Sequence, residues 1–358
     1  MIEIDGSRGE GGGQVLRSSL TLAVLTGKAM RIGNIRAGRK KPGLMPQHLQ
    51  AVRAAAAVSE ARVEGDRQGS QVLEFEPGGV KAGEYRFDIG TAGAATLVLQ
   101  TVFLPLAAGS VASRLTISGG THVPWSPSYH YIERLWIPCL RRLGVNSEVA
   151  MSRAGFYPRG GGLLSAAIRP GLPAVPLRLV DPGRLRSVRI LSAVANLDES
   201  IAERQSRQAR RRLAGCGAPV EVEQFLLSAL SPGTMVMVQA DFEHSRCAYA
   251  ALGERGKPAE RVADEAVDPF LAFVASGAAV DEYLADQMLL PLALTPGTSE
   301  LRTARVTRHQ LTNAWVIGRF LPAKIEIEGE EGEVGMVRVN GVGRETWGSG
   351  RGTRNGEK

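Results

Sequence analysis

The sequence predicts an α+β fold, α/β-like in its alternation, with a large domain of three repeated βαβαββ units and a smaller inserted α/β domain. One pattern of strands, a polar or glycine-rich loop and helices occurs three times. Glycines that end the first helix of each copy set the register, because 82 residues separate Gly27 from Gly109 but 188 separate Gly109 from Gly297. The excess, about 106 residues, is long enough for a separate domain.

The first copy is predicted from short alternating segments, which favour strands, and longer apolar periods, which favour helices. It comprises a strand at 2–5, a glycine-rich loop at 9–13, a helix at 14–25, a strand at 30–35, a basic loop, a helix at 47–58 and strands at 62–64 and 71–75. Such a unit cannot bury its apolar face alone, so we expect the three copies to pack with their helices inward.

The second and third copies follow the same order. The second has a strand at 85–89, an apolar helix ending at Gly109, a strand at 114–118, a loop at 119–128, a helix at 129–143 and strands near 147–151 and 162–168. The third begins with a helix at 280–294 and continues with a strand at 300–306, a helix at 312–320 and strands at 324–328 and 335–339. We therefore divide the chain into repeats one and two (1–181), an inserted domain (182–278), repeat three (279–341) and a disordered tail (342–358).

Composition bounds the partners and the compartment. The net charge of +7 favours an anionic partner such as a nucleotide or nucleic acid. The three cysteines are far apart and form no Cys-x-x-Cys pair, so we expect neither a zinc site nor disulfides, and a reducing cytoplasm fits. The amino terminus lacks the pattern of a signal peptide. An uncharged run at 91–113 contains proline and glycine, which favours a buried helix over a membrane span.

His309 is the candidate nucleophile, because it stands between a predicted strand and a predicted helix, where its ring can project into a cleft. A packed or surface imidazole is the alternative. The glycine-rich loop at 9–13 offers free backbone amides to a phosphate, although a tight structural turn explains the glycines as well. Glu10 within this loop could hold a divalent cation or simply stabilise the helix amino terminus.

Other polar residues suggest where an anionic ligand could bind. Arg17 shares a helix face with Gln14, and guanidinium groups suit phosphate oxygens. The loop that holds Arg36 and Arg39, followed by Gln47 at the next helix start, is either a phosphate site or a solvated basic loop. In the clustered arginines of residues 205–212 we see a candidate RNA-binding helix or a solvated face.

A nucleobase pocket is suggested by the second and third copies. Gln100 lies in a long apolar helix, where a buried amide needs a partner, either in its own repeat or on a ligand base. Tyr283, Asp286 and Gln287 share one helical face that could stack on and hydrogen-bond a base; a capping, solvent-facing turn is the alternative. His122 and His130 lack supporting spacing, and we predict structural roles for them.

Taken together, these stretches resemble the RNA 3′-terminal phosphate cyclase family along nearly the whole chain. The matching motifs are GEGGGQ at 9–14, IRAGRKKPGL at 35–44, QHL at 47–49, DIGTAG at 88–93, SGGT at 118–121, YPRGGG at 157–162, GKPAE at 256–260, YLADQ at 283–287 and HQLTN at 309–313. The resemblance implies a large domain similar to the translation initiation factor C-terminal fold and a thioredoxin-like inserted domain. It also implies an ATP-dependent ligase-type reaction with Mg²⁺ or Mn²⁺, in which RNA with a 3′-terminal phosphate is converted to a 2′,3′-cyclic phosphate through a histidine–AMP intermediate.

The resemblance also implies a role for each matching residue. His309 would be the nucleophile and Glu10 the metal contact. Phosphates of ATP or of the RNA end would be bound by Arg17, Arg36, Arg39 and Gln47. The ATP or AMP pocket would comprise Gln100, Pro127, Tyr283, Leu284, Ala285, Asp286 and Gln287, with Pro127 and Tyr283 on opposite faces of adenine.

Two other functions are compatible with parts of the pattern. One is a non-catalytic cyclase-like protein that binds RNA in ribosomal RNA processing, but such a protein would lack the nucleophilic histidine. The other is an enolpyruvyl-transferase-like enzyme, which would form no nucleotidylated intermediate. Nothing in the sequence indicates a membrane partner or sets the oligomeric state.

Overall fold

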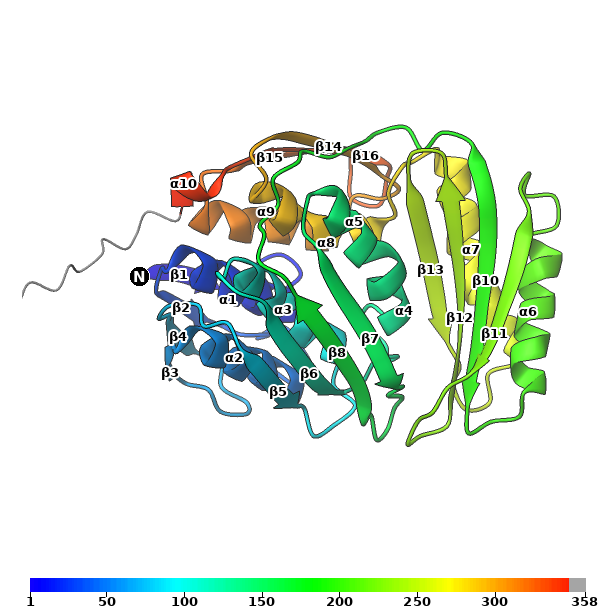
Figure 1. Ribbon diagram of the computed structural model, residues 1–358, viewed down its shortest axis with the longest axis horizontal. Helices are drawn as coiled ribbons and strands as arrows, with labels where there is room; N and C mark the ends of the chain where they lie inside the picture. Colours follow the sequence, from blue (N-terminus) through cyan, green and yellow to red (C-terminus); the bar gives the residue numbers. More distant parts are fainter. Residues whose placement is uncertain (348–358) are drawn as a thin grey trace, which may run out of the picture.

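The computed structural model describes residues 1–347, and it has the mixed α+β architecture that the sequence predicts (Figure 1). Its strands form four separate four-stranded sheets, each of which contains one parallel pair and two antiparallel pairs. Figure 1 shows α8 and α9 directly beneath one sheet and next to α1.

The first sheet has the order β1-β2-β4-β3 and is followed along the chain by the second, with the order β5-β6-β8-β7. The strands of the first are β1 (Ile2–Asp5), β2 (Met30–Gly33), β3 (Arg62–Glu64) and β4 (Leu73–Glu76), with helices α1 (Gly13–Thr26) and α2 (Pro46–Ser59). The second comprises β5 (Glu84–Asp88), β6 (Ser113–Gly119), β7 (Ser147–Arg153) and β8 (Gly162–Ile168), with α3 (Ala95–Ala107), α4 (Tyr129–Tyr131), the π-helical turn η1 (Ile132–Trp136) and α5 (Ile137–Arg142).

The third sheet has the order β9-β14-β16-β15, so all three sheets share one sequence of directions: a parallel pair, then two antiparallel pairs. Its strands are β9 (Arg178–Leu179), β14 (Gly297–Thr303), β15 (Lys324–Glu328) and β16 (Gly335–Gly341), and its helices are α8 (Glu282–Ala293) and α9 (Arg308–Phe320). The predicted third copy began with a helix. Its sheet nevertheless takes a first strand, β9, from residues before 182, because a two-residue strand is too short to show a period.

The fourth sheet fills the stretch predicted as an insertion. It has the order β11-β10-β12-β13, from β10 (Leu185–Ala195), β11 (Val220–Leu226), β12 (Gly233–Phe242) and β13 (Arg246–Leu252), and it packs against α6 (Ser200–Arg212) and α7 (Ala259–Ser276). Alternate residues of β12 face opposite sides, as a strand requires. Val236 and Val238 join the cluster under α6 and α7, whereas Met235 and Met237 belong to the main core.

Three further expectations concern the ends of the chain, membranes and cysteines. Part of the predicted disordered tail, Arg344–Trp347, forms a short helix, α10, and residues 348–358 lie outside the described residues. Within residues 1–347 no helix has the length and apolarity to cross a bilayer. Cys139, Cys216 and Cys247 are all free thiols, as expected.

Candidate active site

His309 lies in the first turn of α9, on the connection that follows β14. The turn begins with a capping box: the Thr307 hydroxyl accepts from the Gln310 amide at 3.1 Å, and the Gln310 side chain accepts from the Thr307 amide at 3.4 Å. The His309 side chain remains 47% exposed. The chain thus holds this imidazole on a rigid helix start while leaving part of the ring open.

The polar residues after His309 bind α9 to its neighbours. The side-chain amide nitrogen of Gln310 donates to the backbone oxygen of Glu282 at the start of α8. Thr312 accepts from the Glu10 amide at 3.1 Å. Asn313 accepts from the Ser18 hydroxyl at 2.7 Å and donates to the Asp286 backbone at 3.3 Å. Three helices from distant parts of the chain therefore meet around His309.

The glycine-rich loop needs its glycines because other groups occupy the space of their missing side chains. A Cβ atom on Gly9, which has φ near +62°, would lie 2.1 Å from the Thr312 hydroxyl. A Cβ atom on Gly13 would lie 2.3 Å from the imidazole of His48. The loop consequently packs directly on α9 and on the start of α2.

Glu10 is held between a cation and the imidazole. One carboxylate oxygen forms an ion pair with Arg39, whose guanidinium also donates to the Glu10 backbone oxygen at 3.1 Å. The other, Oε2, is buried without a hydrogen-bond partner and lies 3.9 Å from Nδ1 of His309. A buried carboxylate oxygen without a hydrogen-bond partner destabilises the folded state. Oε2 of Glu10 is therefore free to bind a ligand.

Gln14 lies in the first turn of α1 and joins His309 to α8. Its side-chain oxygen forms a short hydrogen bond with Nδ1 of His309, and its amide nitrogen donates to Oδ1 of Asp286 at 2.8 Å. The sequence placed Gln14 on the Arg17 face of the helix but assigned it no role. Only the assembled helices reveal these two contacts.

Charges around this cluster shift several pKa values. Burial, followed by the nearby Arg17 and Arg39, lowers the pKa of His309 below its usual value, which favours the neutral ring. Burial lowers the pKa of Arg17 to about 10, although neighbouring Asp286 raises it, so the guanidinium remains charged at pH 7. Burial raises the pKa of Asp286 to about 7, and the Gln14 hydrogen bond and Arg17 oppose this shift.

His48 is a neighbour of the site that the sequence did not single out. Burial and then Arg17 and Arg36 lower the pKa of His48 to about 3, so this imidazole is neutral, and its Nδ1 accepts from the Met45 amide at 3.2 Å. The QHL motif was the available signal, but a histidine after a glutamine does not by itself indicate burial against two arginines.

The remaining predicted phosphate ligands are partly engaged by the protein. The Arg36 guanidinium donates to the backbone oxygens of Lys41 and Gly43, at 2.8 and 2.9 Å, and so braces its own loop. Gln47 accepts from the Ala94 amide at 3.2 Å, which joins α2 to the start of α3. Arg17 and Arg39 are the two arginines whose charges lower the pKa of His309.

The predicted nucleotide residues lie on two helices and a loop. Gln100 of α3 donates to Gln287 of α8 at 2.7 Å, so these two amides are brought together. Tyr283 is 53% exposed, as a stacking ring must be, whereas Leu284 and Ala285 are buried in the core. The Pro127 backbone oxygen accepts from the Thr96 hydroxyl at 2.8 Å. Within residues 1–347 no hydrogen bond joins Pro127 or Tyr283 to the His309 cluster.

His122 and His130 form a buried chain that supports their predicted structural role. Their rings are joined at 2.9 Å, and His122 contacts the Thr121 hydroxyl at 2.9 Å. Each ring also stacks on a phenylalanine, Phe156 for His122 and Phe225 for His130. Phe225 belongs to β11, so the pair joins the second and fourth sheets.

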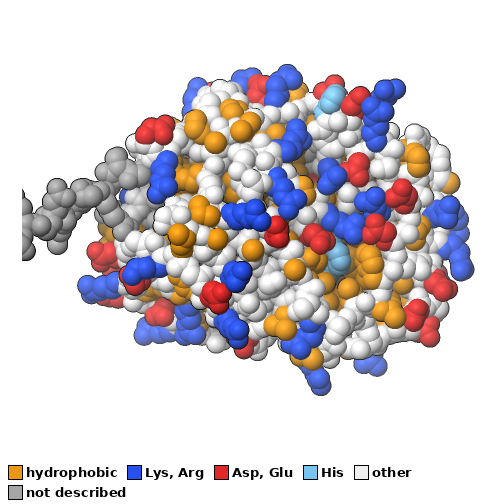
Figure 2. Space-filling model, viewed as in Figure 1, with side chains coloured by type: hydrophobic (Ala, Val, Ile, Leu, Met, Phe, Trp, Pro, Cys, Tyr) orange, Lys and Arg blue, Asp and Glu red, His pale blue; other side chains and the backbone are white. Residues whose placement is uncertain are grey.

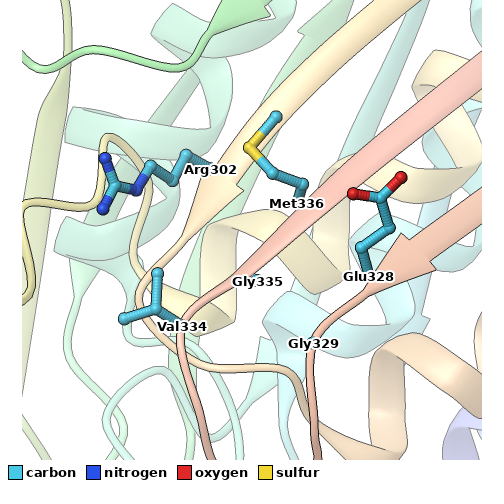
Figure 3. Close-up of a pocket in the computed structure, with 6 residues that line it drawn as sticks. All are labelled: Arg302, Glu328, Gly329, Val334, Gly335 and Met336. Carbon is cyan, nitrogen blue, oxygen red and sulfur yellow. The ribbon is translucent and has the colours of Figure 1, made fainter.

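One surface hollow lies away from this site. It has a volume of about 250 Å³ and lies on the third sheet, where Figure 3 shows Arg302, Met336 and Glu328 beside two glycines. These three residues are cross-strand neighbours on β14, β16 and β15. Leu301 and Val337, which alternate with them, face the core. The hollow is therefore on the outer face of the sheet.

Two of the five arginines of helix α6 are paired with acidic residues of α7. Arg204 pairs with Glu260 at 2.7 Å, and Arg212 pairs with Asp264 and Asp268 at 2.8 and 2.7 Å. Figure 2 shows basic and acidic side chains interspersed over the visible face. The sequence could not reveal this pairing, because the acids lie on α7. Within residues 1–347 Arg207, Arg210 and Arg211 are exposed and form no ion pair, so RNA binding by α6 stays a prediction.

Known proteins were compared with this chain. A sequence model described as RNA 3′-terminal phosphate cyclase matches residues 8–327. Proteins of that name are 45% identical in Methylococcus capsulatus, over 95% of this chain and 97% of the relative, and 44% identical in Trichormus variabilis, over 94% and 99%. One from Thermococcus gammatolerans is 43% identical over 94% of this chain and 97% of its own length.

Among solved structures, the enolpyruvyl transferase NikO from Streptomyces tendae aligns with a TM-score of 0.40 and 10% identity, over 97% of this chain and 49% of its own. A likeness at that level carries no argument about fold or function. The match of the family model along most of the sequence, together with the identity to relatives over nearly their full lengths, is decisive. The chain belongs to the RNA 3′-terminal phosphate cyclase family.

Proposed function

We propose that this protein is an ATP-dependent enzyme that converts the 3′-terminal phosphate of RNA to a 2′,3′-cyclic phosphate through a histidine–AMP intermediate. The observation that supports this most is the His309 cluster, in which a partly open imidazole with a lowered pKa lies beside Arg17, Arg39 and Glu10. The names of the family relatives support the substrate and the reaction. A non-catalytic RNA-binding role would leave this arrangement without a purpose.

The reaction has three steps. Nε2 of His309 attacks the α-phosphorus of ATP, the bond to the β-phosphate oxygen breaks, and pyrophosphate leaves. An oxygen of the RNA 3′-phosphate then attacks the same phosphorus and releases the imidazole, giving an RNA adenylate. Finally the adjacent 2′-hydroxyl attacks the terminal RNA phosphorus, loses its proton and displaces AMP.

Positive charge and backbone amides offset the negative charge on the reacting phosphates. Arg17 and Arg39 lie beside His309, and the amino-terminal amides of α1 face the same region. We assign Arg36 and Gln47 to the phosphates through the adjoining loop and helix start. Gln100 and Gln287, joined at 2.7 Å, would read the base.

Adenine would be stacked between Tyr283 and Pro127, while Leu284, Ala285 and Asp286 shape that side of the pocket. This assignment is supported by the exposure of Tyr283 and by the bond between Tyr131 of α4 and Asp281, which brings the start of α4 to the start of α8. We propose that the reaction takes place in the cytoplasm, where three free thiols are stable.

A divalent cation fits Glu10 as its single protein carboxylate. Oε2 of Glu10 is buried and lacks a partner, and no group of three histidine, cysteine or acidic residues suited to a metal occurs in the described chain. Magnesium commonly binds through one or two carboxylates, with water and substrate phosphates completing its shell. Bound there, such an ion would neutralise charge on the phosphates of ATP.

We also propose that the three sheets of identical order descend from one βαβαββ unit, similar to the translation initiation factor C-terminal fold. Residues 182–278, between β9 and α8, would then be an inserted thioredoxin-like domain. Support comes from the strand order that the three sheets share and the fourth lacks, and from the separate apolar cluster beneath α6 and α7.

The test is transfer of label from ATP carrying it at the α-phosphate, with Mg²⁺ or Mn²⁺. We expect acid-labile label on the wild-type protein and at least roughly 100-fold less on His309→Asn, because the nucleophile is absent. The matched control is His244→Asn, an exposed histidine on the fourth-sheet side, which should label as wild type does.

Two results would reject the proposal. Label on His309→Asn at the wild-type level would place the nucleophile elsewhere. A folded wild type that takes no label, yet binds RNA, would favour the non-catalytic alternative.

A further inference from the structure

The hydrogen bonds of Gln14 with His309 and with Asp286 indicate which ring nitrogen of His309 carries the proton. Gln14, Asp286 and His309 belong to α1, α8 and α9, and Asn313 further joins α9 to the Asp286 backbone and to Ser18 of α1. A side chain shared by three packed helices has little freedom to rotate. Its orientation is therefore a property of the fold.

The chemistry of the partners determines which end of the Gln14 amide points where. An ionised carboxylate only accepts hydrogen bonds, so the amide nitrogen of Gln14 must face Asp286. Burial raises the pKa of Asp286 to about 7 and Arg17 opposes this shift, so Asp286 is ionised above about pH 7, where this orientation of Gln14 holds. The carbonyl oxygen of Gln14 is thereby turned toward His309.

A carbonyl oxygen likewise only accepts, so the ring nitrogen that faces it must carry the proton. That nitrogen is Nδ1 of His309. In a neutral imidazole the other nitrogen, Nε2, then has a free lone pair. Glu10 is the second acceptor near Nδ1, at 3.9 Å, and it favours the same tautomer.

We propose that Gln14 is a positioning residue, which, oriented by Asp286, holds His309 in the tautomer protonated on Nδ1 and so directs the lone pair of Nε2 toward the reacting phosphorus. This inference deepens the function proposed above and rests on it for the identity of the electrophile. The assignment of the proton does not depend on the electrophile, because it rests on the hydrogen bonds of Gln14 and on the ionised form of Asp286.

An amide suits this position better than a carboxylate. A second carboxylate at position 14 would repel Asp286 at 2.8 Å and favour the imidazolium, which has no lone pair to donate. Gln14 transmits the orientation without adding charge. When Nε2 bonds to phosphorus, the ring becomes positive with its proton still on Nδ1, and the Gln14 oxygen stabilises that charge. No proton has to move in this step.

The first measurement is the tautomer itself, by nitrogen NMR of protein labelled on histidine, with the His309 signals assigned from the His309→Asn spectrum. We expect a protonated Nδ1 and an unprotonated Nε2 in the wild type without ATP. In Gln14→Met, which keeps the length but cannot accept, we expect the two tautomers to mix. An Nε2-protonated ring in the wild type would overturn the proposal.

The second measurement is the rate of self-labelling from ATP. Gln14→Met should react roughly 100-fold more slowly at saturating ATP, with KM changed less than threefold. The chemical step is slowed because His309 is no longer held in the Nδ1-protonated tautomer and its Nε2 lone pair is no longer directed at the phosphorus. Asp286→Asn, whose amide no longer fixes the orientation of Gln14, should show a smaller loss and partial tautomer mixing. Unchanged kcat in a folded Gln14→Met would refute the role.

Failure of this inference differs from failure of the proposed function. If the wild type shows the Nδ1-protonated tautomer but takes no label, the positioning by Gln14 stands and the covalent reaction does not. If it takes label normally with an Nε2-protonated ring, the reaction stands and the positioning role is wrong. Gln14→Asn, which keeps the amide on a shorter arm, serves where Gln14→Met fails to fold.

Discussion

At the scale of single residues, histidine has two different roles in this protein. His309 is partly open, and Arg17 and Arg39 disfavour its protonated form. His122 and His130 are buried, bonded to each other and stacked on phenylalanines. The same side chain thus serves as a candidate nucleophile where it is accessible and as a packing element where it is enclosed.

The buried pair predicts a pH dependence of stability. Burial lowers the pKa of His130 to about 4 and that of His122 well below its usual value, whereas both return to about 6.5 on unfolding. Below pH 6.5 the unfolded chain therefore binds more protons, and stability falls as the pH falls toward the folded pKa values. For His130 this shift corresponds to a loss of about 2 kcal/mol at pH 5, and His122 adds a loss of the same sign.

Thermal unfolding between pH 7.5 and 5 checks this expectation. His130→Gln, which keeps an acceptor for His122, should lose less stability on acidification than the wild type, since one titrating group is gone. His244→Gln, made at an exposed position, should follow the wild-type slope. Equal slopes for all three proteins would show that the buried pair does not titrate on unfolding.

At the scale of elements, the amino terminus of α1 has the tightest packing around the site. The glycine loop that precedes it lies against Thr312 of α9 and His48 of α2. A side chain on Gly13 would displace His48 and Arg17 together. The position of the helix start therefore fixes the position of the catalytic cluster.

Gly13→Ala should both destabilise the protein and slow self-labelling. The added Cβ would lie 2.3 Å from His48 Nε2 and 2.8 Å from the Arg17 guanidinium. Overpacking of this kind typically costs about 1–3 kcal/mol. Gly38→Ala is the matched control, because a Cβ there meets no atom within 4 Å.

Chemical denaturation and the labelling rate measure the two effects. A Gly13→Ala protein that matches Gly38→Ala in both would contradict the close packing of the loop on α2.

Most elements of the fold could be predicted from the sequence, and the resemblance to the cyclase family implied Glu10, Arg39 and His309 as site residues without showing their contacts. Periodicity located the long helices, but the helix after His309 begins at Arg308 and not at residue 312 as predicted, because its first turn is polar and shows no apolar period. The hydrogen bonds that join Asp286 to Gln14 and Gln14 to His309 could not be predicted, because these residues are far apart in the chain and meet only when the helices pack. The ion pairs of Arg204 and Arg212 on α6 could not be predicted for the same reason, since their acidic partners lie on α7.

At the scale of the whole molecule, the fourth sheet is built into the main core rather than attached to its surface. Met235, Met237 and Leu191 belong to the main apolar cluster. The Asp281 carboxylate accepts from Tyr131 of α4 at 2.6 Å and from the Ala248 amide of β13 at 3.4 Å. Apolar and polar contacts therefore both cross this boundary.

This continuity predicts one cooperative unfolding transition for the whole chain. We expect calorimetry to give a single transition, and Met237→Ala to lower its midpoint without splitting it, at a cost of about 2–5 kcal/mol. Hydrogen exchange should show protection lost together in β12 and in α8. Two resolved transitions, with only the lower one moved by Met237→Ala, would instead indicate independent domains.

The short strand β9 has a consequence for biosynthesis. Arg178 of β9 is paired with Glu300 of β14, which is 122 residues later in the chain. Ribosomes add roughly 5–20 residues per second, so β9 leaves the ribosome about ten seconds before its partner exists. During that interval β10 to β13 and their two helices are complete and can fold first. The third sheet then closes last, and nascent chains stalled before residue 282 would lack α8 and α9 and would expose the apolar surface that these helices later cover.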